Sequence, residues 1–180
     1  MHLWTAINID GQLEEVKKKA RCIEQEIGFK SSAFDLPSHI SLKISFPVDS
    51  NAEARVIETI LAYYKTLKPF SVDVKGIEVE GTIVWIRIKE NAILDGIHKE
   101  LDRILSEKHG ITPHPFDLDF KFHSTLFLDP DKEKIATAYN KIKKIEIPSS
   151  LRAGELIIGA SPSGEIGTYS VIRTVALLEN

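Results

Sequence analysis

The sequence predicts an α+β protein of two pseudo-symmetric lobes, each an antiparallel sheet with outer helices, arranged around a central cleft. The order strand, helix, strand, helix occurs twice along the chain, and each helical segment carries one apolar face that would pack on a sheet. A chain of 180 residues with 43% hydrophobic residues can bury a sizeable core. We expect one bilobal domain over 1–180, with a first lobe at about 1–68, a second at about 69–180, and C-terminal strands that can exchange between lobes.

Seven segments have the alternating or continuous apolar pattern of strands, and turn residues bound each of them. They are residues 3–9, 39–46, 70–79, 82–89, 122–128, 155–160 and 170–178. Glu80 and Gly81 separate the third from the fourth, which predicts a hairpin there.

Four other segments repeat apolar residues every three or four positions, as amphipathic helices do. Their apolar positions run from Leu13 to Ile27, from Val56 to Leu67, from Leu94 to Leu105 and from Ile135 to Ile145. Asp129 is placed to cap the last helix, with Pro130 at the first helical position, where a missing N–H costs nothing. His98, inside the third helical segment, is expected on the surface.

The charge balance limits the kind of nucleic acid that this protein can bind. The formal net charge is −3, whereas proteins that coat long nucleic acids neutralise many phosphates with Lys and Arg. Any nucleic-acid substrate should therefore be short, or held at one end.

The single cysteine, Cys22, cannot form an internal disulfide. The N-terminal segment MHLWTAINID has neither a basic region nor a long apolar core, and no apolar run approaches the roughly 18 residues of a membrane span. We expect a cytoplasmic protein that has no membrane partner and acts as a monomer.

Two histidines are followed, two residues later, by a hydroxyl residue. They are His39 with Ser41 in the segment HISL, and His123 with Thr125 in the segment HSTL. Residues two apart on a strand point to the same face, so each motif would present an imidazole beside a hydroxyl. Both motifs fall on the third element of their half, an equivalence that chance does not arrange.

These residue types suit the cleavage of a phosphodiester. One group must take a proton from the attacking oxygen, and another must give a proton to the leaving oxygen. Histidine titrates near neutral pH, so one ring can be neutral while the other is charged. The hydroxyls can donate hydrogen bonds to the phosphoryl oxygens. A bell-shaped pH dependence centred near neutrality is expected.

The chain resembles the two-histidine phosphoesterases, which include the bacterial 2'-5' RNA ligase and RNA 2',3'-cyclic phosphodiesterase proteins and which carry a pair of His-x-Thr/Ser motifs. The segment KPFSVDVKGIEVEGTIVWIRI resembles the family's middle hairpin, and LDGIHKELDRIL resembles the helix after it. The resemblance implies that His39 and His123 are the catalytic pair and that Ser41 and Thr125 bind the phosphate. The first motif departs from the family in having Ser where Thr is commoner.

The resemblance also implies the reaction. The expected substrate is a nucleotide or a short RNA end that carries a 2',3'-cyclic phosphate or a 2'-5' phosphodiester. Hydrolysis and ligation are then one mechanism under different water and substrate supply, with a ribose 5'-hydroxyl as the nucleophile in ligation. We expect His123 to act as the base toward water and His39 as the acid toward the leaving ribose oxygen. Nothing in the sequence requires ATP or another cofactor.

Three further side chains are candidates for substrate binding. Lys43 and Lys121 share the strand face of their motifs by two-residue alternation, which would place positive charge near a bound phosphate. Tyr169, just before the last strand, is a candidate for a hydrogen bond to the ligand.

Other functions stay open on sequence grounds. A binding module would hold a nucleotide or RNA end without turnover, and a scaffold would keep the two histidines as core residues. A metal site would recruit His39 and His123 with His114 and a carboxylate of Asp117 or Asp119. Dense His, Cys and Asp ligand spacing is missing, so we expect no metal.

Overall fold

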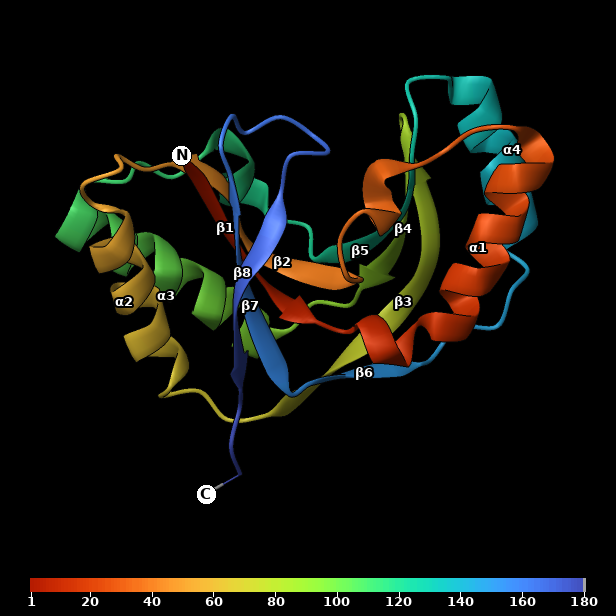
Figure 1. Cartoon of the computed structure of the whole chain (residues 1–180). Coiled ribbons are helices and arrows are strands. Elements are labelled where there is room, and N and C mark those ends of the chain that lie inside the picture. Colours follow the sequence, from red (N-terminus) through yellow and green to blue (C-terminus); the bar gives the residue numbers. More distant parts are fainter. Residues whose placement is uncertain (180) are drawn as a thin grey trace.

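The computed structural model describes residues 1–179 and shows two four-stranded antiparallel sheets with four helices, the predicted α+β class (Figure 1). The first sheet has the order β2-β1-β7-β8 and the second the order β5-β4-β3-β6. The strands are β1 (His2–Asn8), β2 (His39–Pro47), β3 (Phe70–Glu80), β4 (Ile83–Ile88), β5 (His123–Leu128), β6 (Ser150–Ala153), β7 (Glu155–Ser161) and β8 (Ser170–Ala176). The predicted hairpin joins β3 to β4, with Gly81 at a positive φ of 60° in its turn.

The helices are α1 (Glu14–Ile27), α2 (Glu53–Tyr64), α3 (Ala92–His109) and α4 (Lys132–Ile142). Three short 3₁₀ helices, η1 (Asp10–Gln12), η2 (Ser32–Phe34) and η3 (Pro115–Asp119), lie in the connections. The Asn91 side chain caps α3 by accepting hydrogen bonds from two backbone amides, and Gly110 ends it in the left-handed conformation.

Helices α1 and α3 pack on strands from the other half of the chain. Helix α3 packs on β2 and beside α2, while α1 packs beside α4 over β3, β4 and β5 (Figure 1). The late strands β7 and β8 pair onto β1. Each sheet, with the helices that cover it, therefore combines elements from both halves of the chain. The repeat predicts the order of the elements, but an apolar helix face does not specify which sheet it will cover.

Two local predictions were wrong. Helix α4 is capped by Asp131, which accepts from the amides of Glu133 and Lys134, so Pro130 precedes the cap instead of opening the helix. Strand β6 was missed because its four residues are too few to show an alternating pattern. The side chain of Asp129 accepts from the amide of Asp131 and thus shapes the turn before the cap.

The two motif strands meet where the sheets join. Each sheet ends on one of them, because β2 and β5 are edge strands, and these two edges lie in contact without pairing. Most buried apolar residues of both sheets and all four helices form one continuous core, and Trp4, Ala6 and Ile157 form a second, small cluster. Within residues 1–179, none of the helices combines the length and the apolar character needed to cross a membrane.

Candidate active site

The two motifs occupy equivalent places in their sheets. His39 lies opposite Asn8 on β1, and His123 lies opposite Arg87 on β4. Both imidazoles are half-buried, as are the hydroxyl residues that follow them. The contact between β2 and β5 brings the two motifs to one place on the molecule.

Main-chain carbonyls orient both rings in the same way. Nδ1 of His39 lies 2.8 Å from the carbonyl oxygen of Pro37, and Nδ1 of His123 lies 2.6 Å from that of Lys121. A carbonyl can only accept, so each Nδ1 carries the hydrogen and donates it. Each Nε2 is then left as the atom that can take or give a proton.

An indole packs against each imidazole. The ring centroids of Trp4 and His39 are 4.7 Å apart, and those of Trp85 and His123 are 4.2 Å apart. Sequence reasoning missed both indoles, although a signal existed. They are the only two tryptophans of the chain, and they lie on β1 and β4, the equivalent strands of the repeat.

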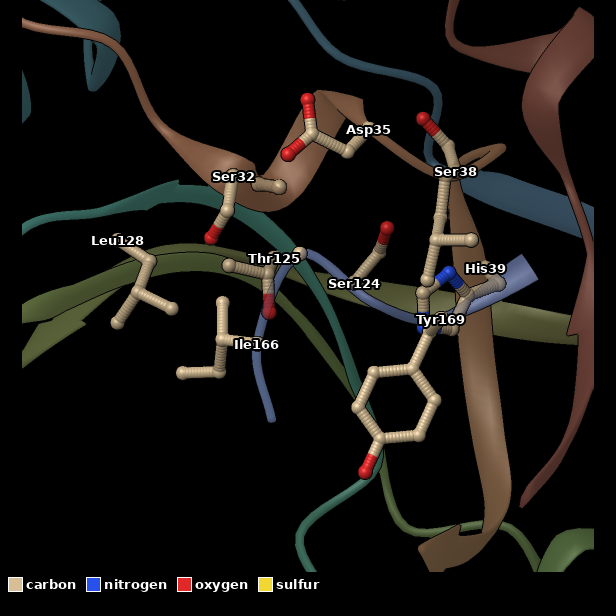
Figure 2. Close-up of a pocket in the computed structure, with 12 residues that line it drawn as sticks. Ser32, Asp35, Ser38, His39, Ser124, Thr125, Leu128, Ile166 and Tyr169 are labelled. Carbon is tan, nitrogen blue, oxygen red and sulfur yellow. The ribbon is translucent and has the colours of Figure 1, made fainter. Parts of the chain in front are cut away.

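Two cavities open at the junction, and each is lined by both motifs. A cavity of about 180 Å³ is lined by His39 and Thr125 together with Ser124 and Tyr169, as Figure 2 shows. A larger cavity of about 530 Å³ is lined by His123 and Ser41. Each cavity therefore holds the imidazole of one motif and the hydroxyl of the other.

Burial lowers the pKa of both imidazoles. For His39 the desolvation of the ring is opposed by the hydrogen bond to the Pro37 carbonyl. For His123 desolvation is again the largest cause, the Lys121 carbonyl opposes it, and the positive charges of Arg87 and of His39 lower the pKa further. Each ring therefore loses its proton at a lower pH than an ordinary histidine.

Lys43 does not face the site, which corrects the sequence prediction. Its side chain is 1% exposed, and its ammonium group pairs with Asp102 and Asp117 on the far side of the strand. Thr5 and Ala6 are consecutive on β1, but their partners on β2, Lys43 and Ser41, are two residues apart. The extra residue on β2 is a β-bulge. The bulge breaks the alternation, and Ile44 lines the cavity in place of the lysine.

Lys121 and Tyr169 both reach the cavities. The Lys121 side chain is 43% exposed, lines the larger cavity and lies 3.4 Å from the carboxylate of Glu80. Tyr169 lines the smaller cavity, but its hydroxyl already donates to the Gly164 carbonyl at 2.8 Å and contacts the Ser45 hydroxyl at 2.6 Å. Its ring is thus the part presented to a ligand.

Two phenylalanines and an arginine that the sequence did not point out lie near the second motif. Phe116 and Phe120 line the larger cavity beside Trp85, and Phe116 is 73% exposed. Arg87 lies across from His123 in register. The strand pattern of β4 placed Arg87 on a sheet, but only the pairing register shows which residue it faces.

The one group of residues in 1–179 with the spacing of metal ligands lies away from the two motif histidines. It consists of His98, Asp102 and Asp117, whose candidate ligand atoms lie within 4.8 Å of one another. The Lys43 ammonium already lies 2.6 Å from an oxygen of Asp102 and contacts Asp117, so these carboxylates have a cation. His98, expected on the surface, is 4% exposed because it continues the buried stripe of α3 four residues after Leu94.

Comparisons with known proteins agree with this architecture. A family model described as the 2'-5' RNA ligase superfamily matches residues 8–161. Escherichia coli LigT in its apo form is 16% identical, with a TM-score of 0.60 over 99% of this chain and 98% of LigT. No curated protein sequence matches the chain.

Two other solved structures show the same fold. TT0787 of Thermus thermophilus has a TM-score of 0.67 at 14% identity, over 98% of each chain. Usb1 of Kluyveromyces marxianus has a TM-score of 0.51 at 14% identity, also over 98% of each chain. The family model covers most of the chain, and the fold agrees over nearly its full length. The chain belongs to the 2'-5' RNA ligase superfamily, the two-histidine phosphoesterases.

Proposed function

We propose that this protein cleaves 2',3'-cyclic phosphates or 2'-5' phosphodiesters of nucleotides and short RNA ends by metal-independent acid and base catalysis. Membership of the superfamily supports a phosphoesterase type of activity. The observation that carries the proposal is the crossed arrangement of the cavities, in which His39 shares a wall with Thr125, and His123 shares one with Ser41. A phosphate at the junction would contact both hydroxyls and lie between the two Nε2 atoms.

The proposed reaction uses each group once. Nε2 of His123 takes a proton from water as the water oxygen forms its bond to phosphorus. The bond from phosphorus to one ribose oxygen breaks, and Nε2 of protonated His39 gives that oxygen its proton. The product is a ring-opened monophosphate. Ser41 and Thr125 donate hydrogen bonds to the two non-bridging oxygens, where negative charge builds up.

The environment of His123 favours the role of base. The positive charge of Arg87 lowers the pKa of His123 beyond the effect of burial, which favours the neutral form of this ring. His39 has no such cation among the causes of its lowered pKa. When a ribose 5'-hydroxyl replaces water as the nucleophile, the same two histidines would catalyse ligation.

The larger cavity offers a place for the nucleoside. Phe116, Phe120 and Trp85 supply aromatic surface there, and bases of any kind stack on aromatic rings. Lys121 adds positive charge for a neighbouring phosphate. LigT of E. coli has been solved with 3'-AMP and with ATP, which supports a nucleotide ligand for this fold.

A product analysis tests the proposal. The wild-type protein is incubated with each 2',3'-cyclic nucleotide, and with matched 2'-5' and 3'-5' dinucleotides, and the products are separated by chromatography. We expect a ring-opened monophosphate from the cyclic substrates and cleavage of the 2'-5' dinucleotide in preference to the 3'-5' one. Ligand-induced thermal stabilisation without any product would instead identify a binding module.

Both motifs come from one chain, so we propose that the monomer is the active unit. We also propose that the reaction takes place in the cytoplasm. The exposed free thiol of Cys22 fits a reducing compartment.

A further inference from the structure

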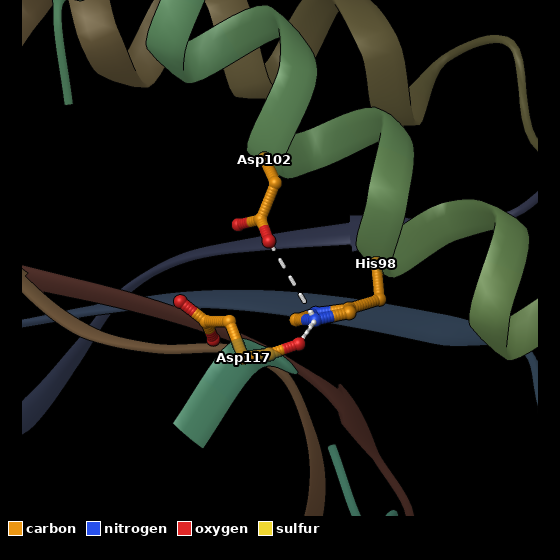
Figure 3. Close-up of side chains that lie close together, drawn as sticks. All are labelled: His98, Asp102 and Asp117. Carbon is orange, nitrogen blue, oxygen red and sulfur yellow. Dashed lines mark hydrogen bonds and ion pairs between the residues drawn. The ribbon is translucent and has the colours of Figure 1, made fainter. Parts of the chain in front are cut away.

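Four side chains form a buried cluster behind the first motif, which we call the ion cluster. Its members are Lys43 on β2, His98 and Asp102 on α3, and Asp117 on η3 (the last three are drawn in Figure 3). The Lys43 ammonium lies 2.6 Å from Oδ1 of Asp102 and contacts Oδ2 of Asp117. The cluster thus links β2, the strand that carries His39, to α3 and η3.

His98 is held in the cluster by two main-chain carbonyls. Its Nδ1 lies 2.8 Å from the Leu42 carbonyl oxygen, and its Nε2 lies 3.1 Å from the Asp117 carbonyl oxygen. Carbonyls only accept, so both ring nitrogens must donate, and only the imidazolium form has two N–H groups. Oδ2 of Asp102, 3.6 Å from Nε2, and the stacked ring of Phe120, with centroids 4.4 Å apart, both suit a positive ring.

With His98 in the imidazolium form, the cluster holds two cations and two carboxylates and is neutral as a whole. Buried charges are tolerated when they are paired, and removing one partner leaves a charge without compensation. The arrangement thus holds its elements together only while all four members are present.

The cluster joins the walls of the active site. His98 binds the backbone of Leu42, the residue directly after Ser41. On the other side, Oδ2 of Asp117 accepts from the His114 amide at 2.6 Å and so closes the turn that begins η3. Both contacts act on main-chain atoms, which fixes the path of each segment.

From η3 the chain runs directly into the second motif. Phe120 stacks on His98 and lines the larger cavity. The carbonyl of Lys121, the next residue, holds Nδ1 of His123. A shift of η3 relative to β2 would therefore move the ring of His123 relative to the hydroxyl of Ser41.

We propose that the ion cluster is a positioning device, in which Lys43, His98, Asp102 and Asp117 fix the segment 114–123 against β2 and thereby set the geometry of the two catalytic motifs. None of the four lines either of the two cavities, so they act through the residues that do. The inference rests on the proposed function, because it concerns the geometry of that reaction.

Kinetics of two cluster variants test it. Lys43→Met removes the central cation, and Asp102→Asn, at a side chain that is 17% exposed, is the milder change. We expect kcat for a 2',3'-cyclic nucleotide to fall about 10- to 100-fold with a smaller change in KM, because small misplacements of catalytic groups cost rates of this order. Ile60→Val, a buried change on α2, is the matched control and should lower the melting temperature at unchanged kcat.

Nitrogen-15 NMR of the histidine side chains gives a readout that mere destabilisation would not change. We expect both His98 nitrogens to show the protonated signature at neutral pH, and the His123 resonances to shift in Lys43→Met and Asp102→Asn but not in Ile60→Val. If Lys43→Met does not fold, Asp102→Asn carries the test. A neutral-ring signature for wild-type His98, or unchanged His123 resonances in a folded cluster variant, would overturn the proposal.

The outcomes separate this inference from the proposed function. A wild-type protein without turnover refutes the function, and the NMR comparison then decides the role of the cluster. An active wild type whose cluster variants keep its kcat refutes the positioning role and leaves the function intact.

Discussion

At the scale of single residues, the two imidazoles make equivalent contacts with their surroundings. A backbone carbonyl two residues earlier fixes the tautomer of each ring, an indole covers one face, and burial lowers both pKa values. The differences lie in charge, since Arg87 lies across from His123 and the uncharged Asn8 lies across from His39. The two rings therefore differ in their electrostatic environment, although they occupy equivalent positions in the two sheets.

The lowered pKa values move the expected pH optimum. The working form needs one neutral and one protonated ring, and both rings lose their protons below the ordinary histidine value of about 6.5. We therefore expect the maximum of kcat/KM, which reports the free enzyme, on the acid side of about 6.5 instead of near neutrality. A pH series with a 2',3'-cyclic nucleotide measures it. A maximum above pH 7 would show that the groups seen in kcat/KM are not this pair.

The same shifts make stability depend on pH. Between the lowered folded-state pKa and the unfolded value of about 6.5, the unfolded chain binds more protons than the folded one. The free energy of unfolding should be at its full value above about 6.5 and decrease as the pH falls through this window. Denaturant titrations at several pH values should show a smaller decrease in the double variant His39→Asn/His123→Asn. His109, whose pKa is lowered by burial and by Arg55, leaves a residual slope.

The hydroxyls should matter less than the imidazoles. One neutral hydrogen bond contributes on the order of 1 kcal/mol, so Ser41→Ala and Thr125→Ala should each lower kcat/KM about fivefold. Steady-state kinetics of the two variants and of the double variant give the comparison. A loss in either single variant as large as that from a histidine variant would assign the hydroxyl a part in the proton transfers.

At the scale of elements, the packing of β1 against β7 supports the first motif. Trp4 lies opposite Gly159, and a Cβ atom at Gly159 would fall 2.0 Å from Nε1 of Trp4. The indole can cover His39 only because this strand position has no side chain.

Gly159→Ala should therefore displace Trp4, lower stability by about 1–3 kcal/mol through overpacking, and reduce kcat through His39. Gly96→Ala, on the exposed face of α3 with open space around it, is the control and should stabilise by roughly 0.5–1 kcal/mol. Thermal melts of both variants measure the change in stability, and steady-state kinetics measure the change in kcat. Full activity in Gly159→Ala would mean that Trp4 does not support the ring of His39.

The sequence predicted regular elements well and irregular positions poorly. Alternation holds along an unbroken ladder, which is why Ser41 and Thr125 reach the cavities beside the two histidines. It failed for Lys43 because a bulge, set by the partner strand, lies between it and Ser41. The helical spacing places His98 on the buried face of α3. The prediction put it on the surface because histidine is polar.

At the scale of the whole molecule, the candidate active site forms where the edge strands of the two sheets come into contact. The repeat in the sequence indicated two equivalent motifs, and the structure joins them along β2 and β5. The helices and late strands that cross between the halves could not be assigned from sequence, because an apolar face carries no information about its partner sheet. This exchange ties the halves together, so the relative position of the two histidines depends on the whole fold.

The most direct test is the turnover of a 2',3'-cyclic nucleotide in excess EDTA by the wild type, His39→Ala and His123→Ala. The wild type should keep its full rate, since the two imidazoles carry out both proton transfers. Each variant should lose about 10²–10⁴-fold in kcat, the usual contribution of a general acid or base. Loss of wild-type activity in EDTA with recovery on added metal, or near-normal activity in either variant, would contradict the two-histidine mechanism.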